Sequence, residues 1–503
     1  MKKTKKRSFP TAYTVLFIVL IFAAILTHTV PSGLYAKLLY NADATNFVVT
    51  MPDGSETEYP ATQETLDQLG IKVNVEKFTD GSIYKPVAIP GSYEQIESNP
   101  QGIIDIIKAP IQGIHESIDI ITFVFIIGGI IGILNNSGAF DAGFASLSRA
   151  TKGKEYLLIV IITFLISLGG NTFGLAEETI ALYPILVPVF MIAGYDALVC
   201  IAALYMGSSI GTMFSTVNPF SAVIGSNAAG ITFTNGLTFR VIGLVVATAI
   251  TVVYIIRYAE KIKKNPEQSL IFSQKSEIEE KFLNSHSAKE IPDFTFKRKL
   301  MLAIFTAAFG VMIWGVSTQG WWFTEMTALF LGVGIVICFL SGMSEKDAVQ
   351  YFVAGAADLV GVALTIGVAR AVNIIMDNGL ISDSILNYAT TVVQGMNGGI
   401  FAIIMLVIFL VLGFFIPSSS GLAVLSMPIM APLADTVGVP RDVVVSAYQY
   451  GQGLMAFITP TGLILVTLSM VDVTYDKWLK FIMPLMGIIG AFSAVMLILQ
   501  AVL

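Results

Sequence analysis

Cysteine and histidine are scarce in this sequence of 503 residues, and their scarcity removes several kinds of site. The two cysteines, Cys200 and Cys338, both lie in apolar stretches, so we expect neither a disulfide framework nor a thiolate metal cluster. The three histidines are too scattered for the spacing of zinc ligands: His28, His115 and His286. The sequence therefore predicts no bound metal and no other cofactor.

Charged residues are also few. They make up 13% of the chain, against about 25% in ordinary soluble domains, whereas hydrophobic residues make up 55% and the mean hydropathy is +0.76. A soluble protein of this length would need many more polar side chains to cover several domains. The formal net charge is only -6 and the basic residues flank apolar segments, so nucleic acid is not an expected partner.

Motifs for nucleotide-driven or catalytic chemistry are missing. The chain has no G-x-x-x-x-G-K-[ST] loop to hold nucleotide phosphates, which disfavours an ATP-driven pump. It also has no H-E-x-x-H motif, and the serine run 418–420 has no histidine nearby to act as a base. The sequence therefore predicts a protein that is not an enzyme, and leaves a carrier or a passive channel.

What the chain does have is a series of long apolar runs. The first, Tyr13 to Val30, has 18 residues, which is longer than the core of a signal peptide and favours an uncleaved membrane helix. Ten more begin near Asp119, Glu155, Ala197, Phe239, Lys299, Phe323, Asp358, Phe401, Val443 and Lys480. They show no alternation of period two, so the sequence predicts an all-α polytopic membrane protein.

Basic residues set the expected orientation. Lysines and arginines gather at the N-terminus, at Arg149–Lys154 and between residues 258 and 297, which places these segments and the N-terminus in the cytoplasm of a bacterial cell. Residues 31–100 have few lysines and belong outside, as a small cap or a disordered spacer. The expected parts are residues 1–30 (tail and first membrane helix), 31–100 (extracytoplasmic), 101–257 (first repeat), 258–297 (cytoplasmic linker), 298–343 (two scaffold helices) and 344–503 (second repeat and final helix).

The two halves resemble each other at an offset of about 240 residues. Five pairs of motifs recur in the same order: Asp119-x8-Gly128 and Asp358-x8-Gly367; Asn136–Gly138 and Asp377–Gly379; Gly174–Ala176 and Gly421–Ala423; Ile185-x2-Pro188-x5-Gly194 and Ile429-x2-Pro432-x5-Gly438; Asn218–Pro219 and Thr459–Pro460. Counting crossings starts the first copy outside and the second inside. Inverted repeats of this kind support alternating access, so the pattern favours a secondary transporter.

Each half also contains an apolar helix interrupted by small polar residues. The interruptions are 168–174, within residues 155–193, and 417–421, within residues 401–437. Flanking arms of about 12–16 residues are too short to cross a core of about 30 Å, so we expect two re-entrant hairpins. A second interruption follows each hairpin: Asn218–Pro219 after Ser208–Thr216, and Thr459–Thr461 after Gln449 and Gln452. Free backbone groups at these breaks suit an ion or a polar solute.

The candidate substrate-binding residues are the polar side chains at these breaks: Asn171, Thr172, Glu177, Glu178, Asn218, Ser418, Ser419, Ser420, Thr459 and Thr461. Ionisable residues inside apolar runs are costly and suggest function. Arg370 is the basic residue within such a run, either as a substrate group or as a structural charge. Glu178 is either a direct ligand or the partner of Arg370.

Several motifs resemble the YfcC/DcuC-like group of the ion transporter superfamily. They are Phe9–Thr14, Gly174–Thr179, Val217–Phe220, Pro417–Gly421 and Ile458–Thr461, and the likeness covers nearly the whole chain except 40–100 and the linker. The resemblance implies an elevator-type transporter, often a homodimer, with Na+ or H+ as a possible coupling ion. The tips here read Gly170–Thr172 and Ser418–Ser420, which departs from the superfamily's Ser-Asn-Thr signature for sodium.

The resemblance also narrows the substrate. The pattern is more similar to the arginine/ornithine exchangers of Gram-positive bacteria than to carriers of C4-dicarboxylates. Glu177 and Glu178 suit a cationic side chain, whereas Arg370 suits an organic anion unless a glutamate neutralises it. The sequence therefore favours exchange of basic amino acids, with a C4-dicarboxylate or other organic anion as the alternative.

Overall fold

The fold is known from a computed structural model, which describes residues 10–81, 83, 85–143, 146, 153–287, 292–319, 321–393 and 398–502. In these residues seven helices are long and apolar enough to cross a membrane: Ala12–Thr29, Ile118–Asn136, Leu237–Lys264, Phe296–Val316, Phe323–Ser341, Glu345–Asn378 and Tyr475–Val502. Each follows an uninterrupted apolar stretch of sequence, and such a stretch is helical in lipid because every backbone N–H and C=O must be paired within the helix. The prediction of a mostly helical, multi-pass protein is confirmed.

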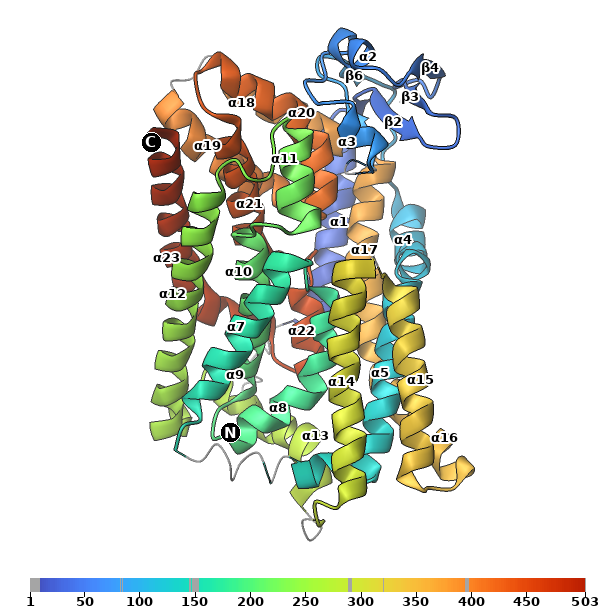
Figure 1. The fold of residues 1–503 in the computed structure, drawn as a ribbon, viewed down its shortest axis with the longest axis vertical. Helices are drawn as coiled ribbons and strands as arrows, with labels where there is room; N and C mark the ends of the chain where they lie inside the picture. The colour runs from blue at the N-terminus through green and yellow to red at the C-terminus, as the bar shows by residue number, and fades with distance from the viewer. Residues whose placement is uncertain are drawn as a thin grey trace, which may run out of the picture.

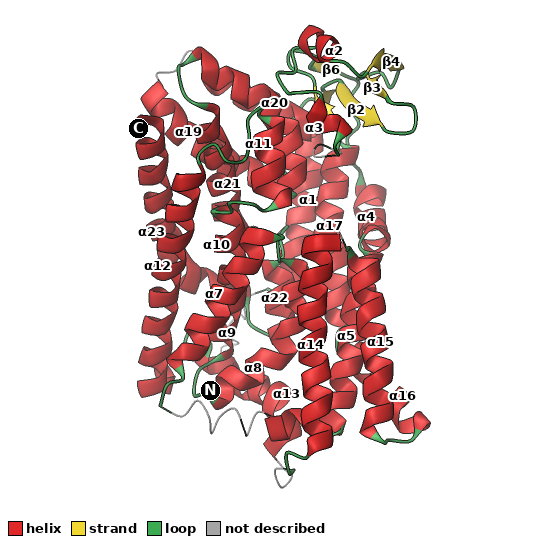
Figure 2. Ribbon diagram, in the orientation of Figure 1, coloured by secondary structure: helices red, strands yellow, loops and turns green. Residues whose placement is uncertain are grey.

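Residues 31–100 fold into a small domain at one end of the helical body (Figures 1 and 2). Its strands are β1 (Gly33–Leu34), β2 (Lys37–Asn41), β3 (Asn46–Thr50), β4 (Glu56–Pro60), β5 (Val87–Ala88) and β6 (Glu94–Gln95), with α2 (Gln63–Gln68) and α3 (Glu76–Thr79). The antiparallel order is β4-β3-β2-β5, and β1 pairs with β6. The expectation of an all-α fold is wrong here, because alternate residues such as Phe47 and Val49 are buried on strands too short to stand out in the sequence, with Phe47 packed against Phe78.

The first half of the membrane body contains α4 (Ile103–Glu116), α5 (Ile118–Asn136), α7 (Tyr156–Thr172), the 3-10 helix η1 (Glu177–Leu182), α8 (Tyr183–Ile192), α9 (Ala197–Ile201), the π-helix η2 (Ala202–Met206), α10 (Gly207–Met213), the π-helix η3 (Pro219–Val223), α11 (Ile224–Ala228) and α12 (Leu237–Lys264). Preceding them, α1 (Ala12–Thr29) leads into the strand domain. Helix α12 continues into the segment expected as a cytoplasmic linker, as far as Lys264.

The connector and the second half follow. They contain η4 (Pro266–Gln268), η5 (Phe272–Gln274), α13 (Lys275–Ser287), α14 (Phe296–Gln319), α15 (Phe323–Ser341), α16 (Glu345–Ala357), α17 (Val360–Asn378), α18 (Ser382–Val393), α19 (Gly398–Phe415), α20 (Ser419–Thr436), α21 (Arg441–Ala456), α22 (Ile464–Val471) and α23 (Tyr475–Val502). In Figure 1, α7 and α8 lie in the lower half of the body, whereas α19 and α20 lie in the upper half, with α20 beside the strand domain.

Glycines allow four pairs of helices to cross closely. Helix α4 packs mainly on α17, α5 on α16, α7 on α10 and α19 on α21. A Cβ at Gly355 would lie 2.2 Å from the Gly128 carbonyl oxygen, and a Cβ at Gly211 would lie 2.2 Å from that of Ser167. A Cβ at Gly451 would lie 2.6 Å from the carbonyl oxygen of Leu406. Small residues let helix backbones approach closely in a membrane, where lipid supplies no hydrophobic drive. The crossings of α7 with α10 and of α19 with α21 thus hold a hairpin arm against an interrupted helix, whereas those of α4 with α17 and of α5 with α16 join the two halves.

Candidate functional site

The first hairpin turns between α7 and η1. The carbonyl of Gly169 accepts hydrogen bonds from the N–H groups of Phe173, Gly174 and Leu175, and Gly174 has φ +78°, a left-handed conformation that favours glycine. The break therefore begins at residue 173. The expected start at residue 168 is wrong because Gly169–Thr172 remain helical, and α7 has 17 residues rather than the 12–16 expected of an arm.

Two buried asparagines connect this tip to the interrupted helix α10–η3. The Asn171 side-chain oxygen accepts from the backbone N–H of Thr216 at 2.7 Å and from its hydroxyl at 2.9 Å. The Asn218 side-chain amide donates to the Gly170 carbonyl at 2.7 Å, and its oxygen accepts from the Phe220 N–H at 2.8 Å. Both predicted site residues thus hold the tip in place, and their oxygens are already occupied by protein donors.

The other predicted residues of the first tip differ in exposure. Thr172 is exposed and its hydroxyl donates to the Leu168 carbonyl at 2.8 Å, within its own helix. Glu178 is buried and accepts from the Ala176 N–H at 3.0 Å, while Glu177 is half-buried. Both glutamates lie in the first turn of η1, so two carboxylates stand directly after the tip.

The second hairpin turns between α19 and α20, which have 18 residues each, again longer than the arms expected. Ser418 caps α20, accepting from the Gly421 N–H at 3.2 Å. From α21, Gln452 donates to the Pro417 carbonyl at 3.1 Å and Tyr448 donates to the Ser419 carbonyl at 2.7 Å. The second tip is therefore held by side chains of the helix that follows it.

The predicted residues Thr459 and Thr461 lie in the break between α21 and α22. Both are buried, their hydroxyls are 2.7 Å apart, and Thr461 donates weakly to the Phe414 carbonyl at 3.4 Å. Phe414 belongs to the last turn of α19. Through Thr461, the second interrupted helix thus contacts its hairpin near the tip, just as the first interrupted helix does through Asn218.

The two interrupted helices meet at Gln449. Its amide donates to the Ser215 carbonyl at 3.2 Å and to the Ser215 hydroxyl at 2.8 Å, joining α21 to the break after α10. Among the described residues, the side-chain oxygen of Gln449 is buried without a hydrogen-bond partner. A buried acceptor normally has a donor, so this oxygen suits a solute donor or a cation. The candidate list missed Gln449, although the polar pair of Gln449 and Gln452 in an apolar helix signals it.

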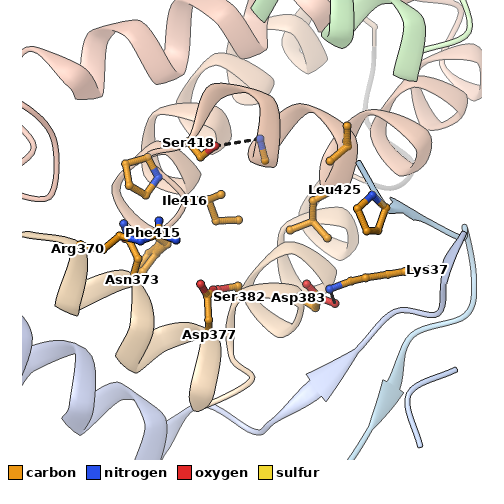
Figure 3. A pocket seen from close by; sticks show the side chains of 14 residues that line it. Lys37, Arg370, Asn373, Asp377, Ser382, Asp383, Phe415, Ile416, Ser418 and Leu425 are labelled. Carbon is orange, nitrogen blue, oxygen red and sulfur yellow. Dashed lines mark hydrogen bonds and ion pairs between the residues drawn. The ribbon is translucent and has the colours of Figure 1, made fainter. Parts of the chain in front are cut away.

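A cavity of about 310 Å³ opens beside the second hairpin, between the start of α20, α17 and the strand domain (Figure 3). Its polar lining includes Lys37, Arg370, Asn373, Asp377, Asp383 and Ser418. Of the candidate residues, only Arg370 and Ser418 line it. The others were missed, although Arg370, Asn373 and Asp377 form a polar stripe on one face of α17, at the i, i+3, i+7 spacing of a helix.

Arg370 pairs with Glu116, not with Glu178. The Arg370 Nε donates to a Glu116 carboxylate oxygen at 2.7 Å, with both side chains nearly half exposed. The interpretation of Glu178 as the structural partner of Arg370 is therefore wrong. Packing explains the pair: a Cβ at Gly113 would lie 2.1 Å from the Gly367 carbonyl oxygen, so α4 and α17 cross closely just before both charged residues.

The strand domain contributes two lysines to this region. Lys37 lies 3.7 Å from buried Asp383, whose carboxylate also accepts from the Tyr35 N–H at 3.0 Å. Lys85 donates to the hydroxyl of the predicted site residue Ser420 at 2.6 Å. Burial, together with the positive charge of Arg370, lowers the pKa of Lys85. The domain thus extends positive charge to the first turn of α20.

Within the part of the chain that the structure describes, no group of three or more His, Cys, Asp or Glu side chains is placed to hold a metal ion. Oxygen groups from serine, threonine, glutamine and backbone carbonyls dominate the two tips and the Gln449 junction. Such groups suit hydrogen bonding to a polar solute or weak binding of a hard cation.

These features belong to a known class of membrane transporters. Residues 9–502 match the family model DcuC, described as C4-dicarboxylate anaerobic carrier. The chain therefore belongs to the DcuC family, and membership implies a small-molecule substrate and a lipid bilayer around the helices.

Two relatives extend over nearly the whole chain. A Haemophilus influenzae protein described only as uncharacterized is 48% identical over 499 residues, covering 99% of this chain and 98% of that protein. The Escherichia coli protein named "Putative basic amino acid antiporter YfcC" is 30% identical over 521 residues, covering 99% of this chain and 97% of that protein.

Solved structures give a weaker likeness. Neisseria gonorrhoeae MtrF, described as illuminating a class of antimetabolite efflux pumps, matches with a TM-score of 0.39 and 16% identity over 98% of this chain and 96% of its own. The Alcanivorax borkumensis YdaH transporter matches with a TM-score of 0.39 and 13% identity over 97% of this chain and 98% of its own.

Proposed function

We propose that the protein is a secondary transporter that exchanges basic amino acids such as arginine and ornithine by alternating access. The observation that carries the proposal is the junction at Gln449, where the two interrupted helices meet around an unpaired, buried acceptor. Each of these helices also holds the tip of a hairpin. A solute bound there would contact both halves of the molecule, which is the requirement for moving it between two sides.

The proposed mechanism treats the two halves as inverted repeats. Helix order supports this, since two helices, a hairpin and an interrupted helix follow one another in each half, and α4 and α5 of the first half pack on α17 and α16 of the second. The hairpins also lie toward opposite ends of the body (Figure 1). We further propose an elevator movement, in which hairpins and interrupted helices move together against α14 and α15, in a homodimer embedded in the bacterial cell membrane with a cytoplasmic N-terminus.

Charge at the candidate sites supports a cationic substrate. Glu177 and Glu178 stand after the first tip, and Glu116 pairs with Arg370, which weakens the main argument for an anion. The printed name of the Escherichia coli relative, a putative basic amino acid antiporter, points the same way. Of the candidate residues, we propose that Thr172, Glu177, Glu178, Ser418, Ser419, Thr459 and Thr461 face the solute, and that Asn171, Asn218 and Ser420 hold the tips.

The second candidate is a carrier of C4-dicarboxylates or other organic anions, coupled to Na+ or H+. The family description favours it, as does the positive charge of Lys37, Lys85 and Arg370 around the second tip. Carboxylates bind well to such groups.

Counterflow in proteoliposomes separates the two candidates. Vesicles with purified protein are loaded with ornithine, succinate or buffer, and uptake of labelled arginine is followed. We expect saturable arginine uptake that internal ornithine accelerates and internal succinate does not. Labelled succinate uptake accelerated by internal succinate would select the dicarboxylate carrier. Uptake that neither saturates nor responds to internal solute would indicate a channel and contradict the proposal.

A further inference from the structure

One face of α17 carries two opposite charges toward the cavity beside the second hairpin. Arg370, Asn373 and Asp377 line the cavity from successive turns of the helix, and Figure 3 shows them around the same space. Asp377 follows Arg370 by seven positions, which at 1.5 Å per residue places their Cα atoms about 10 Å apart along the helix axis. The cavity therefore has a positive and a negative end.

The acidic groups of this cavity are not equivalent. Asp383 is buried and has both Lys37 and the Tyr35 N–H as partners. Asp377 is exposed and, among the residues that the structure describes, its carboxylate has no ion-pair or hydrogen-bond partner. Arg370 and Lys37 act on this carboxylate only from beyond ion-pair distance. A carboxylate that faces a cavity without a cation in contact is well placed to accept one from a ligand. Asp377 is thus the carboxylate still open to a ligand at the negative end.

The positive end is also suited to a ligand. Arg370 shares its charge with Glu116, but nearly half of its side chain is exposed, so its remaining N–H groups can donate to a carboxylate. Ser418 lies on the same cavity and exposes its side chain. A carboxylate at this end would therefore find charged and neutral donors together.

We propose that this cavity is an outward-side selection site, in which Asp377 binds the cationic end of the solute while Arg370 and Ser418 bind its carboxylate. The inference rests on the proposed function and deepens it, because it assigns the choice of substrate to a residue outside both hairpins. The solute must carry its two charges at opposite ends of a chain of several carbon atoms.

This geometry separates classes of solute. The ammonium of an amino acid with a neutral side chain lies beside its own carboxylate and cannot reach Asp377. A dicarboxylate would place its second negative charge near Asp377, where like charges repel. Amino acids with a cationic side chain can bind at both ends of the cavity, so Asp377 favours their binding over that of neutral amino acids and dicarboxylates.

Equilibrium binding to the purified, full-length protein tests the role of Asp377. Labelled arginine is the probe, and citrulline, a neutral molecule of nearly the same shape, is the competitor. We expect Asp377→Asn to weaken arginine binding about tenfold to hundredfold, the usual effect of losing a charged hydrogen bond. The affinity for citrulline, measured by competition, should stay unchanged. Asp377→Glu keeps the charge and should retain most of the arginine affinity.

Glu94→Gln is the matched control, because it removes one negative charge from an exposed residue of β6 outside the cavity. It should bind arginine as the wild type does. The inference would be overturned if Asp377→Asn weakened the binding of arginine and of citrulline equally, or weakened neither. It would also be overturned if the wild type did not bind arginine. A wild type that binds arginine selectively through Asp377 but shows no exchange would contradict only the proposed function.

Discussion

Asn171 offers the sharpest test of how the first hairpin is held. Asn171→Ala removes the acceptor of two hydrogen bonds from buried Thr216, one from its N–H and one from its hydroxyl. A buried N–H left without an acceptor costs about 1–3 kcal/mol, and a lost hydroxyl bond costs about 1 kcal/mol. The variant should therefore lower the free energy of opening the tip by about 2–4 kcal/mol, which raises the opening equilibrium constant roughly 30- to 1000-fold.

Hydrogen exchange read by mass spectrometry measures this opening directly. The peptide that contains Thr216 should exchange faster in Asn171→Ala by the factor above, and arginine uptake should be lost while expression is kept. Thr216→Val keeps the N–H bond and loses only the hydroxyl bond, so its exchange should rise about fivefold. Thr122→Ala is the control, because that exposed hydroxyl bonds only to the Ile118 carbonyl of its own helix.

The result that would refute the reasoning is equally specific. If Asn171→Ala and Thr122→Ala exchange alike at the Thr216 peptide, the hydrogen bonds from Asn171 do not hold the tip. Loss of uptake without faster exchange would instead make Asn171 a direct ligand of the solute.

Three further variants probe other contacts. Gly211→Ala places a Cβ 2.2 Å from the Ser167 carbonyl oxygen and should lower the free energy of thermal unfolding by about 1–3 kcal/mol. Gly310→Ala, whose Cβ would meet nothing within 4 Å, is the control and should leave that free energy unchanged. Gln449→Leu leaves the Ser215 carbonyl without a side-chain donor and should cost about 1–3 kcal/mol in the same assay; an unchanged midpoint would contradict the junction. Hydrogen bonds from the Gly153 N–H, from its own backbone N–H and then from Lys263 lower the pKa of Glu155 to about 2. The ionised Glu155 carboxylate therefore stabilises the folded protein fully above the ordinary carboxyl pKa, and this contribution disappears as pH falls toward 2. Glu155→Gln should lower the free energy of unfolding by under about 1 kcal/mol at pH 7 and leave it unchanged near pH 2.

The membrane helices were predictable because hydrophobic run length alone determines them. The strand domain was not, since each of its strands has only two to five residues and its burial pattern is set by contacts between strands. The small polar residues indicated that each apolar run is interrupted, but not where its helices end. Gly169–Thr172 looks like a helix break in sequence, yet the residues stay helical because α10 packs closely on α7.

The contacts of the candidate residues could not be predicted. Asn171 was expected at the first tip and Asn218 at the break that follows the hairpin, but their partners Thr216 and Gly170 lie 45 and 48 residues away in sequence. Arg370 is separated from Glu116 by 254 residues, so no local pattern connects them. Asp377 stands near the end of a helix, where an exposed acid is ordinary, and only the cavity distinguishes it.

Alternating access itself is tested by labelling the second tip from outside. Cys200 and Cys338 are replaced by serine, Ser418→Cys is introduced on the cavity, and a membrane-impermeant maleimide is applied to proteoliposomes with the strand domain outward. In an exchanger, arginine present only inside should hold the carrier open outward and speed labelling, whereas arginine present only outside should slow it. Equal labelling rates under the two gradients would contradict the account.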